Sequence, residues 1–181
     1  MPMQELHLGR ARKLRVDLPS DGRRRTQRGE VKSMRKILLA EDNPADVYLI
    51  REALREYGVN LPIRVASDGK LVMELIAGGE SSFNAEEFAL IILDLNLPLH
   101  DGTEILERLR VTDSLAGVPV VVLTSSDSPR DRVIARELGA ACYLRKPSDL
   151  SQFLSLGAVF RDLLASSLPS PKADRSEGVP Q

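Results

Sequence analysis

The stretch ALIILDLNLPLHDG, residues 89–102, decides how this chain folds. It begins with an unbroken apolar run, a pattern typical of a strand that is buried on both faces of a parallel sheet. The run ends at a carboxylate, Asp94. A charge in that position is costly unless it lies at the rim of the sheet beside a metal ion or a polar partner. Because open α/β sheets bind ligands at the carboxyl ends of their strands, Asp94 is the first candidate for chemistry.

An earlier apolar run, residues 36–40, ends in acid in the same way. Glu41 and Asp42 follow it directly, and Pro44 then suits the first turn of a helix. If the two strands are neighbours, Glu41, Asp42 and Asp94 converge, and three like charges that close together cannot all stay ionised without a cation. Oxygen ligands select a hard ion, and an open cluster with room for water and phosphate favours Mg²⁺ over a caged Ca²⁺. The sequence therefore predicts a Mg²⁺ site.

Composition is that of a soluble globular protein, since 43% of the 181 residues are hydrophobic and 28% are charged. No apolar run reaches membrane-spanning length and the N-terminus lacks the apolar core of a signal peptide, so we expect a cytoplasmic location. The single cysteine, Cys142, excludes an internal disulfide and fits a reducing compartment. We expect Cys142 to be a small buried apolar residue rather than a reactive thiol.

The two ends of the chain differ from its centre. Residues 1–35 carry ten Lys or Arg and four Asp or Glu, so they hold about +6 charges and the remainder about −7. We expect residues 1–34 to be a disordered basic arm, or to precede a translation start at Met34, immediately before the first strand. A nucleic-acid or anionic-surface contact is an alternative, but a basic run without interleaved aromatics indicates it only weakly. Residues 165–181 are rich in Ser and Pro and are also expected to be disordered.

Between residues 35 and 164, five apolar strand-like segments alternate with helical segments. The expected strands are residues 36–40, 61–66, 89–93, 118–123 and 141–144. The helices carry their apolar residues at 47–54, 71–76, 105–109, 133–138 and, after a cap at Ser148, up to about Leu164. Residues 79–88 contain a polar connection with no assigned role. This alternation predicts a doubly wound five-stranded parallel sheet, and the acidic strand ends fit the flavodoxin-like order 2-1-3-4-5.

With these strand ends assembled, residues 35–164 resemble the receiver domain of bacterial two-component response regulators. The resemblance rests on Glu41-Asp42, Asp94, Pro98, Gly102, Thr124 and Lys146-Pro147 at the corresponding strand ends. The run from Ile37 to Val47 is also similar to stand-alone receivers that serve bacterial phytochrome histidine kinases. The resemblance therefore implies a phosphoprotein of two-component signalling or a phosphorelay.

Within that family, the residue matching Asp94 accepts a phosphoryl group from a kinase phosphohistidine in a Mg²⁺-dependent reaction. The resemblance implies that Asp42 and Asp94 bind the metal directly and that Glu41 holds a coordinated water. Asn96 would offer its backbone carbonyl to the same ion. The protein would then catalyse only its own phosphotransfer and autodephosphorylation, and would not be an enzyme with an external substrate.

The other two strand ends supply a hydroxyl and an amine. Taken alone, Thr124 would be interpreted as a helix cap and Lys146 as a solvated surface charge. A role in the site is favoured only because these residues and the acidic residues converge at one rim of the sheet. The resemblance implies that both bind the phosphoryl group and that Thr124 moves toward it. It also implies that Tyr143 fills the vacated space, although a partly buried strand aromatic is the alternative. The Lys146-Pro147 peptide bond is expected to be cis, as in the family.

The last predicted helix is apolar over an arc of about 220°, wider than a core-facing stripe requires. The residues are Leu150, Phe153, Leu154, Leu156, Val159, Phe160, Leu163 and Leu164. The excess predicts a homodimer through this helix and its neighbours, on a face that receivers often use. A sensor kinase or a phosphotransfer protein should dock near Asp94. His100, in the loop beside Asp94, is expected to be an exposed loop residue rather than one that tunes phosphate lifetime.

Two other function classes remain open from the residues. A Mg²⁺-dependent phosphatase or phosphotransferase could use an aspartate nucleophile on this architecture, but Asn96 stands where such enzymes have a second aspartate and no cap domain is evident. A purely structural interaction domain is disfavoured because every reactive position is filled. Since no DNA-binding output domain is evident either, we expect the signal to pass through protein contacts.

Overall fold

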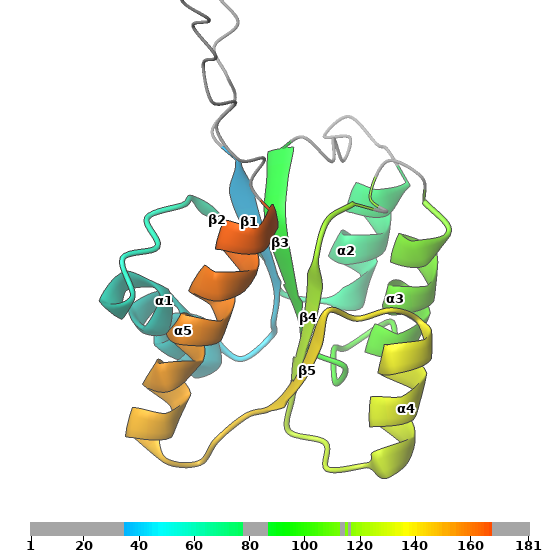
Figure 1. Cartoon of the computed structure of the whole chain (residues 1–181). Coiled ribbons are helices and arrows are strands. Elements are labelled where there is room, and N and C mark those ends of the chain that lie inside the picture. The colour runs from blue at the N-terminus through cyan, green and yellow to red at the C-terminus, as the bar shows by residue number, and fades with distance from the viewer. Residues whose placement is uncertain (1–34, 78–86, 113–114, 116, 168–181) are drawn as a thin grey trace, which may run out of the picture. The chain divides into compact units, whose positions relative to one another are not determined.

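The computed structural model describes residues 35–77, 87–112, 115 and 117–167. These residues form five strands and five helices in strict alternation (Figure 1). The elements are β1 (Lys36–Ala40), α1 (Pro44–Glu56), β2 (Ile63–Ala66), α2 (Gly69–Ile76), β3 (Phe88–Leu93), α3 (Gly102–Arg110), β4 (Val120–Thr124), α4 (Pro129–Glu137), β5 (Cys142–Arg145) and α5 (Leu150–Ser167). The predicted basic arm, nearly all of the 79–88 connection and most of the predicted C-terminal tail lie outside the described residues.

The sheet has the order β2-β1-β3-β4-β5 and every pairing is parallel, which confirms the predicted fold class. Figure 1 shows α1 and α5 on one face of the sheet and α2, α3 and α4 on the other. The strands β1 and β3 are neighbours, and Ala40 is paired with Leu93 at their carboxyl ends. The residues that follow these two strands therefore emerge side by side.

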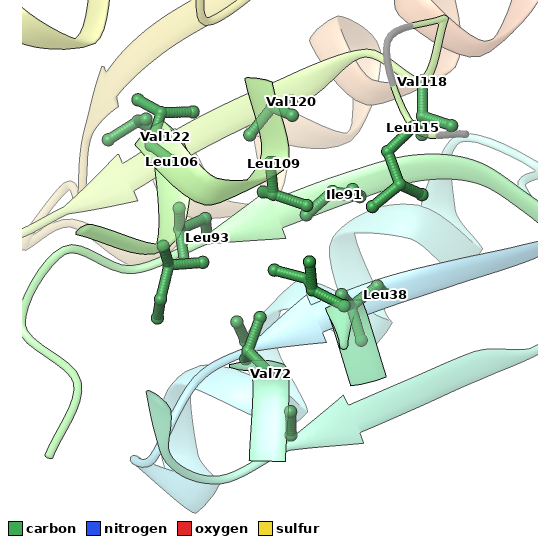
Figure 2. Close-up of a cluster of buried hydrophobic side chains, with 14 of the residues drawn as sticks. Leu38, Val72, Ile91, Leu93, Leu106, Leu109, Leu115, Val118, Val120 and Val122 are labelled. Atoms are coloured by element: carbon green, nitrogen blue, oxygen red, sulfur yellow. The ribbon is translucent and has the colours of Figure 1, made fainter. Parts of the chain in front are cut away.

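Strand β3 is buried along its whole length, as its apolar run predicts for a central parallel strand. Its side chains divide between two clusters on opposite faces of the sheet. Figure 2 shows part of one cluster, in which Ile91 and Leu93 pack with apolar residues of α2 and α3. Leu90 and Ile92 belong to the other cluster, under α1 and α5. A continuous apolar sequence was needed because both faces are covered.

Most helices begin at the residue that their sequence indicates. Asn43, Asp68, Asp101 and Ser128 each accept a hydrogen bond from a backbone N–H in the first turn that follows. The predicted cap of the last helix was wrong by one residue. Asp149, not Ser148, accepts the hydrogen bond from the Gln152 N–H, at 3.0 Å. A carboxylate at this position also offsets the positive end of the helix dipole.

Two predicted strands were too long at their N-terminal ends. Strand β2 begins at Ile63 rather than Leu61, and β4 begins at Val120 rather than Val118. In each case a proline precedes the strand, Pro62 or Pro119, and proline has no N–H to donate to a ladder. The carbonyl of each proline instead accepts a hydrogen bond from the backbone N–H of a residue in the neighbouring strand. Apolar pattern alone does not reveal this limit.

Helix α5 lies directly against α1. A Cβ at Gly157 would lie 2.1 Å from the Ala53 carbonyl oxygen, so the two helices approach more closely than a larger residue would allow. Of the eight apolar residues predicted to line this helix, four are buried, namely Phe153, Leu156, Phe160 and Leu164. Leu150 has 58% of its surface exposed. The core therefore uses only part of the apolar arc.

None of the helices in the described ranges combines the length and the apolar character that a membrane span requires. The described peptide bonds are all trans, so the cis bond expected at Lys146-Pro147 was wrong. The trans form is the intrinsically preferred one even before proline.

Candidate functional site

Three carboxylates meet where β1 and β3 end. Oxygen atoms of Glu41, Asp42 and Asp94 all lie within 4.8 Å of one another. Their closeness follows from the strand register, since the Asp94 N–H donates to the Ala40 carbonyl at 3.0 Å. Glu41 and Asp94 are 2% and 4% exposed, whereas Asp42 is exposed. The structure thus brings together the acidic residues that the sequence singled out, with two of them removed from water.

The Lys146 ammonium lies against this cluster. Its Nζ is 2.6 Å from Asp94 Oδ2, 2.8 Å from Glu41 Oε2 and 2.8 Å from Asp46 Oδ2. The Lys146 side chain is only 8% exposed, and its backbone N–H bonds to the Thr124 carbonyl beyond the end of the β4–β5 ladder. Burial by itself would lower the pKa of Lys146, but the hydrogen bonds to Asp46, Asp94 and Glu41 outweigh it and raise this pKa. The surrounding carboxylates therefore favour the charged form of Lys146.

The charge around Lys146 is not balanced. Four carboxylates, those of Glu41, Asp42, Asp46 and Asp94, lie in or beside the cluster, and one ammonium serves three of them. Burial raises the pKa of Glu41 even though Lys146 and the Asn43 N–H stabilise its ionised form. A divalent cation would offset the excess negative charge. The donors are carboxylate oxygens only, which fits a hard ion such as Mg²⁺.

Thr124 ends β4 on the same rim and is fully buried. Its Oγ1 accepts hydrogen bonds from Asn96 Nδ2 at 3.1 Å and from the Ser126 N–H at 3.2 Å. The Asn96 N–H in turn donates to Asp94 Oδ1 at 3.0 Å. Asn96 therefore links the carboxylate of Asp94 to the hydroxyl of Thr124.

Tyr143 is a half-buried residue of β5, next to the loop that follows Thr124. Its hydroxyl donates to the Ser126 carbonyl at 3.3 Å, and the Arg132 guanidinium lies 4.9 Å from the ring centroid. Burial raises the pKa of Tyr143. The aromatic ring is thus tied to the segment that carries the Thr124 hydroxyl.

Sequence reasoning missed Asp46 as a site residue. Asp46 lies in the first turn of α1, where an acidic side chain is ordinarily explained by the helix dipole. The available signal was its place in the chain, because α1 starts at Pro44, immediately after the acidic strand end. A side chain in that turn can reach the same rim.

Two other predicted residues lie apart from this arrangement. His100 is half-buried rather than exposed, with Nδ1 3.0 Å from Glu104 Oε2. A Cβ at Gly69 would lie 2.6 Å from the His100 Cβ, so His100 packs on the start of α2. Cys142 is half-buried and packs against the apolar cluster that lies under α1 and α5, so it is less buried than expected. Burial raises the pKa of the Cys142 thiol, which disfavours a reactive thiolate.

Known proteins are similar to this chain in fold and in sequence. Response regulator Rcp1 from Synechocystis sp. is 35% identical over 120 residues, which cover 66% of this chain and 82% of that protein. The crystal structure of the phosphorylated cyanobacterial phytochrome response regulator RcpA matches with a TM-score of 0.67 and 36% identity, covering 75% of this chain and 96% of that one. The Mn²⁺-bound form of Rcp1 matches with a TM-score of 0.66 and 31% identity, covering 76% of this chain and 99% of that one.

Other curated relatives are longer, and include proteins described as transcriptional regulators. The chain spans between 44% and 65% of their length. Residues 37–156 match the family described as response regulator receiver domain, and these residues contain all the strand ends described above. This chain therefore belongs to the response regulator receiver domain family, and it is similar to response regulators that include the phytochrome response regulator RcpA.

Proposed function

We propose that this protein is a single-domain response regulator that accepts a phosphoryl group on Asp94 from a histidine kinase. The observation that carries the proposal is the convergence of Asp94 with Glu41, Asp42 and Lys146 at one rim of a receiver sheet. The single-domain form is supported by Rcp1, of which this chain covers 82%. We also propose residues 35–164 as the receiver domain, with the remainder as tails.

In the proposed reaction, a carboxylate oxygen of Asp94 attacks the phosphorus of a kinase phosphohistidine. An O–P bond forms as the P–N bond breaks, and the leaving imidazole takes up a proton. The Asn96 N–H holds one oxygen of Asp94, which orients the carboxylate. Lys146 neutralises charge on the transferred group, a role that suits an ammonium on a flexible stem.

We assign the metal site to Asp42, Asp94 and the Asn96 backbone carbonyl, with Glu41 holding a coordinated water. Bound Mg²⁺ would neutralise the phosphoryl oxygens during transfer. The oxygen-only donor set and the excess negative charge support this assignment, and the similar protein Rcp1 has been crystallised with Mn²⁺.

We propose that phosphorylation acts through Thr124 and Tyr143. The Thr124 hydroxyl, now bonded by Asn96 and Ser126, would turn to donate to a phosphoryl oxygen. The loop after Thr124 would move with it, and the hydrogen bond from Tyr143 to the Ser126 carbonyl would break. The ring would then occupy the vacated space. Phosphorylation in this scheme shifts an existing two-state equilibrium.

We propose a sensor histidine kinase as the partner, of the kind associated with bacterial phytochromes. The support is similarity to RcpA, which is described as a phytochrome response regulator. The kinase would dock at the mouth of the Asp94 site. The cytoplasmic location expected from the sequence stays a prediction.

Phosphoryl uptake tests this function. We expect the protein to gain the mass of one phosphoryl group during brief incubation with acetyl phosphate and Mg²⁺, and to gain none when EDTA removes the metal. Among purified histidine kinases labelled with radioactive phosphate, we expect a phytochrome kinase to transfer fastest. An enzyme of the alternative class would instead turn over many equivalents of the donor, and a structural module would do neither. Either of the last two results contradicts the proposal.

We also propose a homodimer through α5 and its neighbouring elements, because Leu150 remains 58% exposed and only four of the eight apolar residues expected to line this helix are buried. Light scattering should detect a dimer, with or without the phosphoryl mimic beryllofluoride. The variant Leu150→Lys should weaken dimerisation by about tenfold, since it places a charge in an apolar contact. Val111→Lys, at a site that is 70% exposed at the end of α3, is the matched control. A protein that is monomeric under both conditions would rule the dimer out.

A further inference from the structure

Asp46 contacts the reactive centre without belonging to the metal cluster. Its Oδ2 is 2.8 Å from Lys146 Nζ, across 100 residues of sequence, and its side chain is 19% exposed. We propose that Asp46 is a positioning residue for phosphoryl transfer, which anchors the Lys146 ammonium at the mouth of the site while Asp94 reacts. This inference rests on the proposed function of Asp94 and extends it to a residue outside the metal cluster.

The three acceptors of Lys146 have different fates in the proposed reaction. An ammonium has three hydrogens to donate, and here they go to Glu41, Asp46 and Asp94. Asp94 loses its free carboxylate when it becomes an acyl phosphate, and Glu41 is assigned to the metal. Asp46 has neither role. It is therefore the one acceptor of the three that remains available to Lys146 throughout the reaction.

The backbone around Asp46 holds its carboxylate in place. Helix α1 is capped by Asn43, which accepts a hydrogen bond from the Ala45 N–H at 3.0 Å, and it begins with a proline. The helix packs against α5, whose Gly157 allows the close approach described above. Lys146 lies in the segment that leads from β5 into α5. The Asp46–Lys146 pair therefore joins two elements that are already packed together.

The environment of this pair makes it more than a surface ion pair. Exposed pairs contribute little, because water and salt screen them and both side chains lose freedom. Here the lysine is 8% exposed and makes charge-assisted hydrogen bonds at 2.6 to 2.8 Å. Losing one of three such bonds gives Lys146 freedom to leave the position from which it can bind a phosphoryl oxygen.

A double-mutant cycle tests the proposal. We would measure the phosphorylation rate at saturating acetyl phosphate and Mg²⁺ in wild type, Asp46→Asn, Lys146→Met and the double variant. Asp46→Asn should lower the rate about tenfold, the size expected for one hydrogen bond to a charged group. In the Lys146→Met background the same substitution should have no effect, because Asp46 acts through Lys146. The affinity for Mg²⁺, followed by calorimetry, should change little.

Two further variants separate positioning from a general effect. Glu52→Gln removes a negative charge from the same helix, where Glu52 pairs with Arg55, and should leave the rate unchanged. Asp46→Glu should recover part of the lost rate, because it restores a carboxylate to Lys146. This recovery is measured by comparing Asp46→Glu with Asp46→Asn, so it does not depend on any Lys146 variant.

The outcomes distinguish this inference from the proposed function. An Asp46→Asn protein that reacts at the wild-type rate or faster overturns the inference, and so does an equal loss in both Lys146 backgrounds. In those cases phosphorylation of the wild-type protein would still support the proposed function. A wild-type protein that takes up no phosphoryl group overturns the proposed function and this inference with it.

Discussion

Replacing Asp94 by Asn is expected to abolish phosphoryl uptake, a loss of at least about 10³-fold. The amide has nearly the same shape as the carboxylate and can still accept the hydrogen bond from the Asn96 N–H, now 3.0 Å from Oδ1. It cannot attack phosphorus to form an acyl phosphate, because its nitrogen is not nucleophilic. Intact-mass spectrometry after incubation with acetyl phosphate and Mg²⁺ measures the result directly.

A nearby carboxylate supplies the control for this substitution. Asp101 caps α3 from the loop that follows Asp94, and asparagine is an equally good cap. Asp101→Asn should therefore fold normally and take up one phosphoryl group at the wild-type rate. If Asp94→Asn retained wild-type uptake in the same experiment, another residue would be the acceptor and the proposed role of Asp94 would be wrong.

Replacing Lys146 by Met is expected to affect both the reaction and the stability of the fold. The phosphorylation rate should fall on the order of 10²-fold, the cost typical of removing one donor that stabilises developing charge. Without the ammonium, Glu41 and Asp94 are buried carboxylates that have lost their cation. The free energy of unfolding should fall by about 3 kcal/mol, as is usual when one partner of a buried ion pair is removed.

Mg²⁺ should restore part of this lost stability, because a divalent ion can neutralise the same carboxylates. Urea unfolding with and without Mg²⁺ measures both effects. Lys70→Met is the matched control, since Lys70 pairs with Glu74 on the surface and its loss should change stability by less than about 1 kcal/mol. A Lys146→Met protein as stable as wild type without metal would show that the ammonium does not hold the site together.

The fold was predictable from sequence because its strands are buried on both faces. Residues 88–93 of β3 are apolar without interruption, and the structure divides them between two cores. The acidic residues were predictable for a related reason. Glu41 and Asp94 directly follow neighbouring strands of one parallel sheet, so pairing of Ala40 with Leu93 brings them to the same rim.

Features that depend on side-chain reach were not predictable in the same way. Asp46 reaches Lys146 from a helix, and apart from its place soon after the acidic strand end, no local pattern distinguishes it from an acid that only stabilises the helix N-terminus. Asp149 caps α5, but the adjacent Ser148 is also a residue type that caps helices, so the sequence alone did not distinguish the two. Which face of α5 stays exposed depends on the contact between Gly157 and α1. The spacing of apolar residues along the helix does not reveal that contact.

The chemical identity of the phosphorylated residue tests the central claim most directly. An acyl phosphate on aspartate is reduced by sodium borohydride to homoserine, whereas phosphoserine, phosphothreonine and phosphohistidine are not. After incubation with acetyl phosphate and Mg²⁺, reduction and peptide mapping should place homoserine at position 94. Homoserine at another position would contradict the claim that Asp94 is the acceptor. The absence of homoserine from a peptide map that covers the whole chain would contradict it as well.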